Sequence, residues 1–261
     1  MLKYFQYLRR FKFFRFLKRT FFPILRRNKC LRILEHGIHK SQDFRFLPWT
    51  HGIVHIGANE GQERDIYRDC MIPVLWIEPI PEVFLKLQKN IKDYPNQCAL
   101  QALMGESDGG MVDFFLANNG GASSSMLVPH LHKVVASDIK FDRVIRLPII
   151  TFDTLVRERL INIKEYNTLI MDTQGSELLI LRGAQSELQN FDFVKTEISS
   201  FESYVGCPNL KTFSSFMDAN GFDEISRECI FKHSLGEAYD VIFRRRSKKF
   251  SKLNPWLMMF R

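Results

Sequence analysis

Short apolar runs alternate with polar stretches of helical period through the central part of the chain. The apolar runs have the length and composition of buried strands, and the stretches between them repeat apolar residues every three or four positions. The predicted strands are residues 52–57, 73–79, 97–105, 111–118, 166–172, 191–197 and 238–245. The predicted helices are residues 60–69, 81–94, 176–188 and 210–220, and residues 146–160 read as a strand followed by a helix. This alternation predicts an α/β fold with a doubly wound, Rossmann-like parallel sheet, which binds ligands at the carboxyl ends of its strands.

Charge divides the chain into three parts. Residues 1–40 carry twelve Lys and Arg against one acid, and residues 244–261 carry seven and no acid. Because the whole chain has a net charge of +8, residues 41–243 have a net charge of −10. We therefore predict one acidic globular domain over residues 41–243, with a basic, aromatic-rich extension at 1–40 and a basic tail at 244–261.

The two basic segments favour attachment to an anionic membrane surface. Their aromatic rings suit the interface, and their Lys and Arg side chains suit the lipid headgroups. The longest uncharged run in residues 1–30 is only TFFPIL, so we expect neither a signal peptide nor a spanning helix there. Disordered basic tails and RNA binding through the tails are the alternatives. The acidic domain argues against a nucleic acid substrate.

The cysteine pattern bears on the compartment. The five cysteines are odd in number and widely spaced, which is typical of reduced thiols. We predict a cytoplasmic protein, attached peripherally to the membrane if the tails bind lipid.

The sequence VHIGANEGQ, residues 54–62, predicts a nucleoside-binding loop. Gly57 and Gly61 follow the first strand and allow the backbone to approach a ligand closely. Glu78 ends the second strand, where a carboxylate can accept both hydroxyls of a ribose. Position 59 is Asn, whereas a dinucleotide pyrophosphate needs a second glycine in this loop. The residues therefore favour S-adenosylmethionine over a nicotinamide dinucleotide.

Several longer motifs resemble those of the FkbM-type methyltransferases. In chain order they are VHIGANEGQE, VLWIEPIPEVFLKLQKN, NNGGASSSML, TFDTL, LIMDTQGSELLILRGA and TEIS. The resemblance covers about residues 50–245 and implies a class I, S-adenosylmethionine-dependent methyltransferase. It implies O-methylation of hydroxyls on sugars or secondary metabolites. By the same resemblance, Gly57, Asn59, Gly61 and Glu78 fall on cofactor positions, and Asp172 falls where donor and acceptor meet.

His55 departs from the pattern of this family, because many members have Asp at this position. A neutral imidazole could accept a hydrogen bond from the amino group of the methionine part of the cofactor. The alternative is a core histidine that hydrogen-bonds a backbone carbonyl. The sequence leaves both interpretations open.

Three residues are candidate catalytic groups. A sugar hydroxyl is a weak nucleophile, so a general base or a cation is expected to assist its attack. Asp172 and Glu197 lie at the carboxyl ends of strands and are the first candidates, and His132 is the second choice of base. Mg²⁺ held by the two carboxylates is the less favoured variant, so we assign no metal ligands.

The NNGGASSSML loop supplies candidate contacts to a hydroxyl-rich acceptor. These are Asn119, Ser123, Ser124 and Ser125, and Tyr204 is a candidate platform for a sugar ring. The alternative is that this Ser- and Gly-rich run is only a turn. At the level of function, the alternatives are an inactive nucleoside-binding scaffold and an RNA-binding protein that uses the basic tails.

Overall fold

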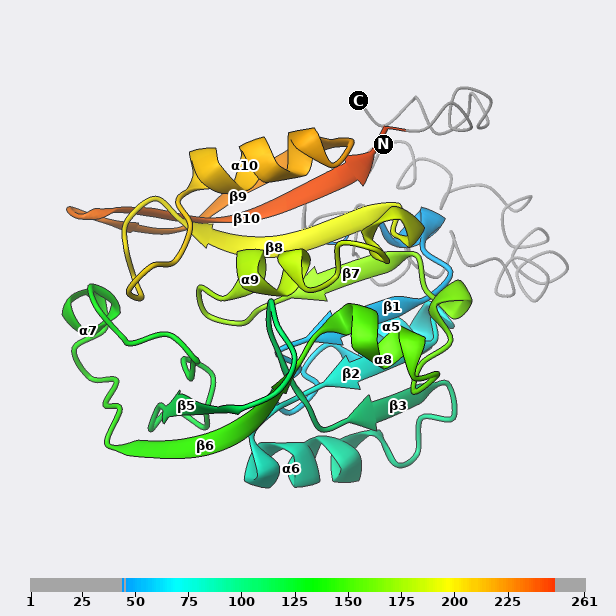
Figure 1. Cartoon of the computed structure of the whole chain (residues 1–261), viewed down its shortest axis with the longest axis horizontal. Coiled ribbons are helices and arrows are strands. Elements are labelled where there is room, and N and C mark those ends of the chain that lie inside the picture. The colour runs from blue at the N-terminus through cyan, green and yellow to red at the C-terminus, as the bar shows by residue number, and fades with distance from the viewer. Residues whose placement is uncertain (1–43, 45, 247–261) are drawn as a thin grey trace, which may run out of the picture.

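The computed structural model describes residue 44 and residues 46–246, which form an α/β fold around a seven-stranded sheet (Figure 1). The strand order is β3-β2-β1-β7-β8-β10-β9. Neighbours from β3 to β8 are parallel, whereas β10 is antiparallel to both β8 and β9. The parallel strands are β1 (Ile53–Ile56), β2 (Val74–Ile77), β3 (Gln97–Leu100), β7 (Thr168–Met171) and β8 (Phe193–Ser199).

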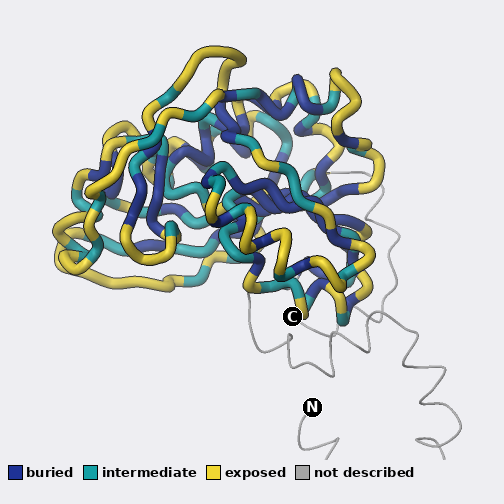
Figure 2. Tube along the Cα trace, turned by 90° about the horizontal axis from the view of Figure 1, so that it is seen from below, coloured by how far each residue is buried: buried dark blue, intermediate teal, exposed yellow. Residues whose placement is uncertain are grey.

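Helices cover both faces of this sheet, as a doubly wound fold requires, so the predicted fold class is confirmed. One face packs against α8 (Phe152–Arg157), α9 (Glu177–Arg182) and α10 (Leu210–Ala219). The other face packs against α5 (Arg64–Asp69) and α6 (Pro81–Ile91). Alternation along β1 sends Val54 to the first face and Ile53 to the second. Figure 2 shows the buried chain segments in the middle of the molecule and the exposed ones in the outer loops.

A second, three-stranded sheet changes the prediction for residues 97–118. The predicted strand 97–105 divides into β3 and β4 (Leu103–Met104), which belong to different sheets. The predicted strand 111–118 is β5 (Met111–Leu116), which pairs antiparallel with β6 (Arg143–Ile150) outside the main sheet. Helix α7 (His132–Val135) and three short 3₁₀ helices, Leu47–Trp49, Ile163–Glu165 and Leu188–Asn190, complete the described elements.

A long hairpin closes the main sheet at one edge. It consists of β9 (Phe222–His233), which was not predicted, and β10 (Gly236–Arg245). The tip of the hairpin extends beyond the rest of the sheet (Figure 1). The domain boundary predicted at residue 243 is too early, because Arg245 lies in β10 and its Nε donates a 2.8 Å hydrogen bond to the carbonyl of Phe191.

The predicted extension at 1–40 and most of the predicted tail lie outside the described residues. Their proposed membrane attachment therefore stays a prediction. Among residues 44 and 46–246, no helix is both long enough and apolar enough to cross a membrane.

Candidate functional site

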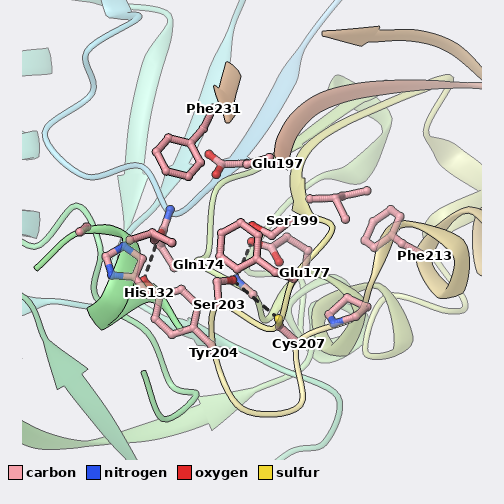
Figure 3. A pocket seen from close by; sticks show the side chains of 17 residues that line it. His132, Gln174, Glu177, Glu197, Ser199, Ser203, Tyr204, Cys207, Phe213 and Phe231 are labelled. Atoms are coloured by element: carbon pink, nitrogen blue, oxygen red, sulfur yellow. Dashed lines mark hydrogen bonds between the residues drawn. The ribbon is translucent and has the colours of Figure 1, made fainter. Parts of the chain in front are cut away.

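Two cavities lie at the carboxyl edge of the parallel strands, on either side of the loop between β7 and α9. The first, which we call the glycine-loop cleft, has a volume of about 210 Å³. It is lined mainly by the segments that follow β1, β2 and β7 and by Gly121, Ala122 and Ser124. The second, which we call the aromatic cavity, has a volume of about 220 Å³ and is shown in Figure 3. The loop contributes Asp172 to the cleft and Gln174 to the cavity.

Gly57 lets the loop after β1 pass directly beside β7. Its φ of +78° is in the left-handed region, and a Cβ built on it would lie 1.9 Å from the carbonyl oxygen of Asp172. Its N–H donates to the carbonyl of Ile77 at 3.0 Å, which joins the loop to β2. A side chain at this position would therefore push β1 and β7 apart at the floor of the cleft.

Glu78 is held in the cleft by two backbone N–H groups. Its Oε2 accepts from the N–H of Asn59 and its Oε1 from the N–H of Ile80, both at 2.9 Å. The residue is 4% exposed, and burial raises its pKa to about 7, although the two hydrogen bonds oppose this rise. Each carboxylate oxygen keeps a further lone pair, so the group can still accept two hydroxyls.

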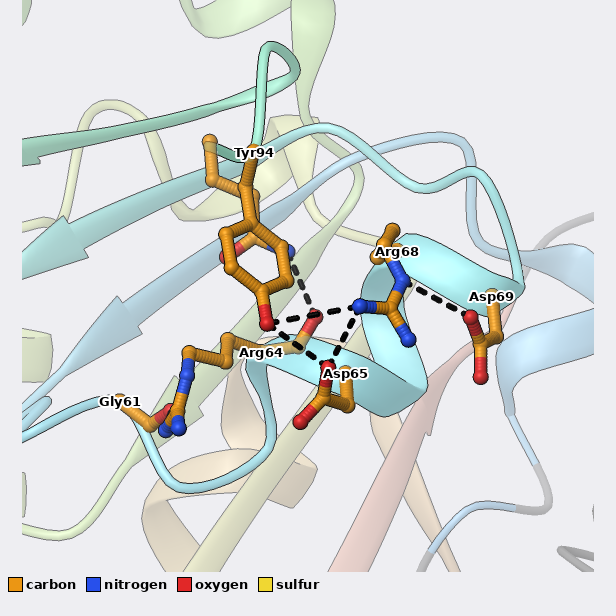
Figure 4. A network of polar contacts seen from close by, with 7 residues as sticks. Gly61, Arg64, Asp65, Arg68, Asp69 and Tyr94 are labelled. Carbon is orange, nitrogen blue, oxygen red and sulfur yellow. Dashed lines mark hydrogen bonds and ion pairs between the residues drawn. The ribbon is translucent and has the colours of Figure 1, made fainter. Parts of the chain in front are cut away.

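Asn59 and Gly61 have different roles in the same loop. Asn59 lines the cleft, has a φ of +45°, and its Nδ2 donates to the carbonyl of Gly120 at 3.2 Å. Gly61 does not line the cleft, because it faces α6, where a Cβ would lie 2.8 Å from the side chain of Leu87. Its carbonyl accepts a 2.9 Å hydrogen bond from Nη1 of Arg64 at the start of α5 (Figure 4). The left-handed residues at 59 and 61 also explain why α5 begins at Arg64 and not at the predicted residue 60.

His55 is a buried neutral histidine in the wall of the cleft. Its ring stacks on Trp76 at a centroid distance of 4.9 Å, and the residue is 6% exposed. Burial lowers its pKa to about 4, although the nearby Asp172 opposes this change. Its Nδ1 is buried and has no hydrogen-bond partner among the described residues. Because Nδ1 has almost no accessible surface, a ligand in the cleft cannot reach this nitrogen, and it does not decide between the two interpretations of His55.

Gln174 connects Asp172 to Tyr204 through its side-chain amide. Its Nε2 donates to Oδ1 of Asp172 at 2.7 Å, and its Oε1 accepts from the hydroxyl of Tyr204 at 3.1 Å (Figure 3). The carbonyl of Gln174 accepts from Oγ of Ser125 at 2.8 Å. These contacts hold Gln174 at a φ of +55°, which is rare for a residue with a side chain.

Asp172 lines the glycine-loop cleft and is hydrogen-bonded to Gln174, which lines the aromatic cavity. Desolvation by the surrounding protein raises its pKa, although its side chain still reaches the open cleft, and the hydrogen bond from Gln174 acts in the opposite direction. Glu177 braces the same loop, because its Oε1 accepts from the N–H groups of Thr173 at 2.9 Å and Gly175 at 3.2 Å. The loop between β7 and α9 is therefore fixed by side chains from both of its ends.

The aromatic cavity contains two of the predicted catalytic residues. Glu197 lines it, and burial together with the charges of Asp172, Asp240 and Glu177 raises the pKa of Glu197 to about 8. His132 also lines it, and burial lowers the pKa of this histidine, which keeps the ring neutral. Glu197 and His132 thus line the aromatic cavity, whereas Asp172 lines the glycine-loop cleft, and the catalytic roles of all three stay predictions.

Tyr204 does not offer a ring face to an acceptor, in contrast to its predicted role. The residue is 1% exposed, and its ring packs against His132 at a centroid distance of 5.2 Å. Its hydroxyl donates to the carbonyl of Ser123 at 2.8 Å as well as to Gln174. Tyr204 lines the aromatic cavity as part of its buried wall and holds the neighbouring loops together.

The predicted acceptor contacts of the serine loop are engaged in hydrogen bonds within the protein. Asn119 Nδ2 donates to Oγ of Ser123 at 3.0 Å, and Oγ of Ser124 accepts from the N–H of Ala117 at 2.9 Å. Ser125 is bonded to Gln174, as described above. Of these four residues only Ser124 lines either cavity, and it lines the glycine-loop cleft. The loop therefore forms a wall of the cleft, and the structure does not place it around the aromatic cavity.

Gln174 and Phe231 of the aromatic cavity were not singled out by the sequence analysis. Gln174 lies in the quoted motif, but no sequence signal shows that its amide reaches two other residues. Phe231 lines the cavity from β9, a strand that was not predicted because many of its residues are charged.

The cleft fits a nucleoside that carries an amino acid better than it fits a dinucleotide. Glu78 can receive a ribose, and His55 and the loop backbone can receive polar groups. No Lys or Arg is found among the described residues that line the cleft, so a pyrophosphate would have no cationic partner. Within the described part of the chain, no group of three or more His, Cys, Asp or Glu is arranged to hold a metal ion.

Solved structures with a similar fold have low sequence identity to this chain. One is an uncharacterized protein from Listeria monocytogenes (10% identity, TM-score 0.44, 76% of this chain and 63% of that chain). Another is Aeropyrum pernix fibrillarin in complex with S-adenosylmethionine (12% identity, TM-score 0.42, 74% of this chain and 66% of that chain). A third is Synechocystis magnesium protoporphyrin IX methyltransferase with bound S-adenosylmethionine (9% identity, TM-score 0.41, 74% of this chain and 69% of that chain). The chain thus spans less than two thirds of the length of the first two proteins.

The family assignment comes from the sequence. A search of curated proteins found no match. The family model described as the methyltransferase FkbM domain matches residues 55–226. The matched range includes the loop after β1, the loop between β7 and α9, and Tyr204, which line the two cavities. This match covers well over half of the chain. The chain therefore belongs to the FkbM methyltransferase family, for which S-adenosylmethionine is the methyl donor.

Proposed function

We propose that this protein transfers a methyl group from S-adenosylmethionine to a hydroxyl of a glycan or a related small molecule. The observation that carries the proposal is the arrangement of two cavities on either side of Asp172 and Gln174. The glycine-loop cleft would hold the donor and the aromatic cavity the acceptor. A carboxylate at their junction is where proton removal is needed.

In this proposal the cleft binds the donor at two points. Glu78 accepts the ribose hydroxyls, since its two oxygens are already oriented by backbone N–H groups. His55, which lines the cleft as a neutral ring, accepts a hydrogen bond from the amino group. Gly57 keeps the floor of the cleft free of side-chain atoms. When bound, S-adenosylmethionine would supply a methyl group attached to a sulfonium sulfur. As the acceptor oxygen bonds to the methyl carbon, the carbon–sulfur bond breaks and the sulfur becomes a neutral thioether.

Asp172 is the proposed general base for the acceptor hydroxyl. Its carboxylate is exposed to the cleft, where an acceptor can reach it, and Gln174 fixes one of its oxygens at 2.7 Å. Glu197, whose pKa is about 8, is largely protonated at neutral pH and is better suited to hydrogen-bond the acceptor than to remove its proton. Neutral His132 is the second candidate base. Positioning of the two reactants contributes up to about 7–11 kcal/mol in favourable cases.

The test is transfer of tritium from methyl-labelled S-adenosylmethionine to a cell-envelope extract by the full chain. We expect label in glycan or glycolipid with the wild type, and a loss of at least about 100-fold with Asp172→Asn. Asp172→Asn should keep its affinity for S-adenosylhomocysteine, because Glu78 and Gly57 are unchanged. Donor binding without any transfer would favour the inactive scaffold, and tritium in RNA would favour the RNA-binding alternative.

A further inference from the structure

The aromatic cavity has acidic and apolar walls and no cationic one. Two carboxyl groups, those of Glu177 and Glu197, are among its lining residues. No Lys or Arg is found among the described residues that line it. The remaining walls include Phe201, Phe213 and Phe231. Ligand pockets usually combine apolar walls with a few polar groups that set orientation, and here those groups include the two acids and the uncharged side chains of Gln174, Ser199 and Ser203.

The acids near the cavity outnumber the cations that could offset them. Asp172 and Asp240 lie close enough to Glu197 to raise its pKa, as does Glu177. Lys195 acts in the opposite direction, but its Nζ lies 3.1 Å from a carboxylate oxygen of Asp240. An anionic group placed in this cavity would therefore face several carboxyls, while the nearby ammonium of Lys195 is already paired with Asp240.

Phe231 supplies the flat surface that Tyr204 does not. Its side chain lies beside that of Glu197 at the cavity (Figure 3), and the residue is 37% exposed. Its ring is nearly parallel to that of His233, with an interplanar angle of 8° and a centroid distance of 6.2 Å, so the two rings restrain each other. An exposed ring next to a carboxyl group can contact the apolar face of a sugar while the carboxyl binds its hydroxyls.

We propose that the aromatic cavity selects an uncharged sugar ring as acceptor and rejects sugars that carry a carboxylate or a phosphate. The ring lies on Phe231, its hydroxyls hydrogen-bond Glu197, and the hydroxyl to be methylated points toward Asp172. The cavity volume of about 220 Å³ is below the usual range for drug-sized ligands, about 300–1,000 Å³, and suits one ring better than an extended glycan. This inference rests on the proposed function, because it assigns the acceptor to the cavity opposite the donor.

Cys207 provides a reporter that does not require the natural acceptor. It lines the cavity, is partly exposed and is a free thiol. Replacing Cys30, Cys98 and Cys229 by Ser in the full chain leaves Cys207 and the buried Cys70. The rate of Cys207 alkylation by iodoacetamide is then measured by mass spectrometry in the presence of saturating S-adenosylhomocysteine.

The probes are the methyl glycosides of glucose, galactose, mannose and rhamnose, with methyl glucuronide and methyl glucoside 6-phosphate as charged counterparts. We expect at least one neutral glycoside to slow alkylation, about twofold at a concentration equal to its Kd. The charged counterparts should need at least about tenfold higher concentration for the same effect. Phe231→Ala should remove protection. At pH 9, where Glu197 is mostly ionised, the discrimination against charge should be stronger than at pH 7, and Glu197→Gln should reduce it to the level at pH 7. Glu82→Gln on the surface of α6 should change neither.

Two results would overturn the proposal. They are equal or better protection by the charged sugars, and no protection by any neutral glycoside. Calorimetry with S-adenosylhomocysteine separates this failure from failure of the proposed function. If the cofactor product binds but sugars do not protect Cys207, only the acceptor inference is lost. If the cofactor product does not bind, the methyltransferase proposal itself is contradicted.

Discussion

Replacing Glu78 by Gln is expected to weaken binding of S-adenosylhomocysteine and to remove most of its pH dependence near neutrality. Each carboxylate oxygen of Glu78 accepts one backbone N–H at 2.9 Å and has capacity for one ribose hydroxyl. A hydrogen bond to a charged group contributes about 1.5–3 kcal/mol, against about 1 kcal/mol for a neutral one. Two such bonds give a loss of about 2–3 kcal/mol, or roughly 30- to 150-fold in affinity.

The pH dependence provides the sharper readout. Burial raises the pKa of Glu78 to about 7, and the ribose hydroxyls need the ionised form as acceptor. Affinity should therefore rise with pH up to about 7 and then level off. Because only a few per cent of Glu78 is ionised at pH 5.5, the wild type should bind roughly 30-fold more weakly there than at pH 8.

Isothermal titration of the full chain between pH 5.5 and pH 8.5 checks this. Glu82→Gln is the matched control, because it removes one carboxylate from the exposed first turn of α6 and leaves the cleft intact. Glu78→Gln should lose the component with a midpoint near pH 7, whereas Glu82→Gln should keep it. If wild-type affinity is flat over this range, or if Glu78→Gln keeps the same slope, the assignment of Glu78 is wrong.

Three further predictions concern the loops around the cleft. Gln174→Ala removes the 2.7 Å hydrogen bond that lowers the pKa of Asp172, so the acidic limb of kcat/KM should move to higher pH without a comparable loss of donor affinity. Gly57→Ala should lower the free energy of urea unfolding more than Gly110→Ala does, because a Cβ at position 57 would lie 1.9 Å from a carbonyl oxygen. At Gly110 no atom lies within 4 Å of a built Cβ, so that variant should lose only about 1–2 kcal/mol from its left-handed φ. Equal losses would contradict the clash at Gly57. His55 has its pKa lowered from 6.5 to about 4, so its contribution to stability is present above pH 6.5 and is lost as pH falls toward 4. The free energy of unfolding of His55→Phe, relative to that of the wild type, should therefore rise by about 2–3 kcal/mol as the pH falls from 7 to 4.5. If this difference between the two proteins does not change with pH, His55 is not a buried neutral histidine.

The elements with strong local signals could be predicted from the sequence. β1, β2 and β7 are largely apolar runs, β8 alternates apolar and polar residues, and Pro81 marks the first residue of α6. Glu78 and Asp172 followed from the rule that strand-end acids meet at one edge of a parallel sheet. These predictions needed only the chain order and the period of the pattern.

The remainder depends on tertiary pairing that leaves little trace in the sequence. β9 exposes most of its residues and is stabilised by its pairing with β10, so its composition resembles a loop. β5 has the pattern of a strand, but no residue in it shows that its partner is β6 and not the main sheet. Tyr204 and Gly61 were expected at ligand positions, yet the first is buried by packing on His132 and the second faces Leu87. A residue type and its spacing cannot show which neighbour covers it.

The most direct test of this account is a crystal structure of the full chain with S-adenosylhomocysteine. We expect the ribose hydroxyls on Glu78, the amino acid part beside Gly57 and His55, and the sulfur atom directed past Asp172 toward the aromatic cavity. That result would place the transferred methyl group at the junction of the two cavities. Cofactor product bound in the aromatic cavity, or a sulfur atom directed away from Asp172, would contradict the assignment of donor and acceptor sites.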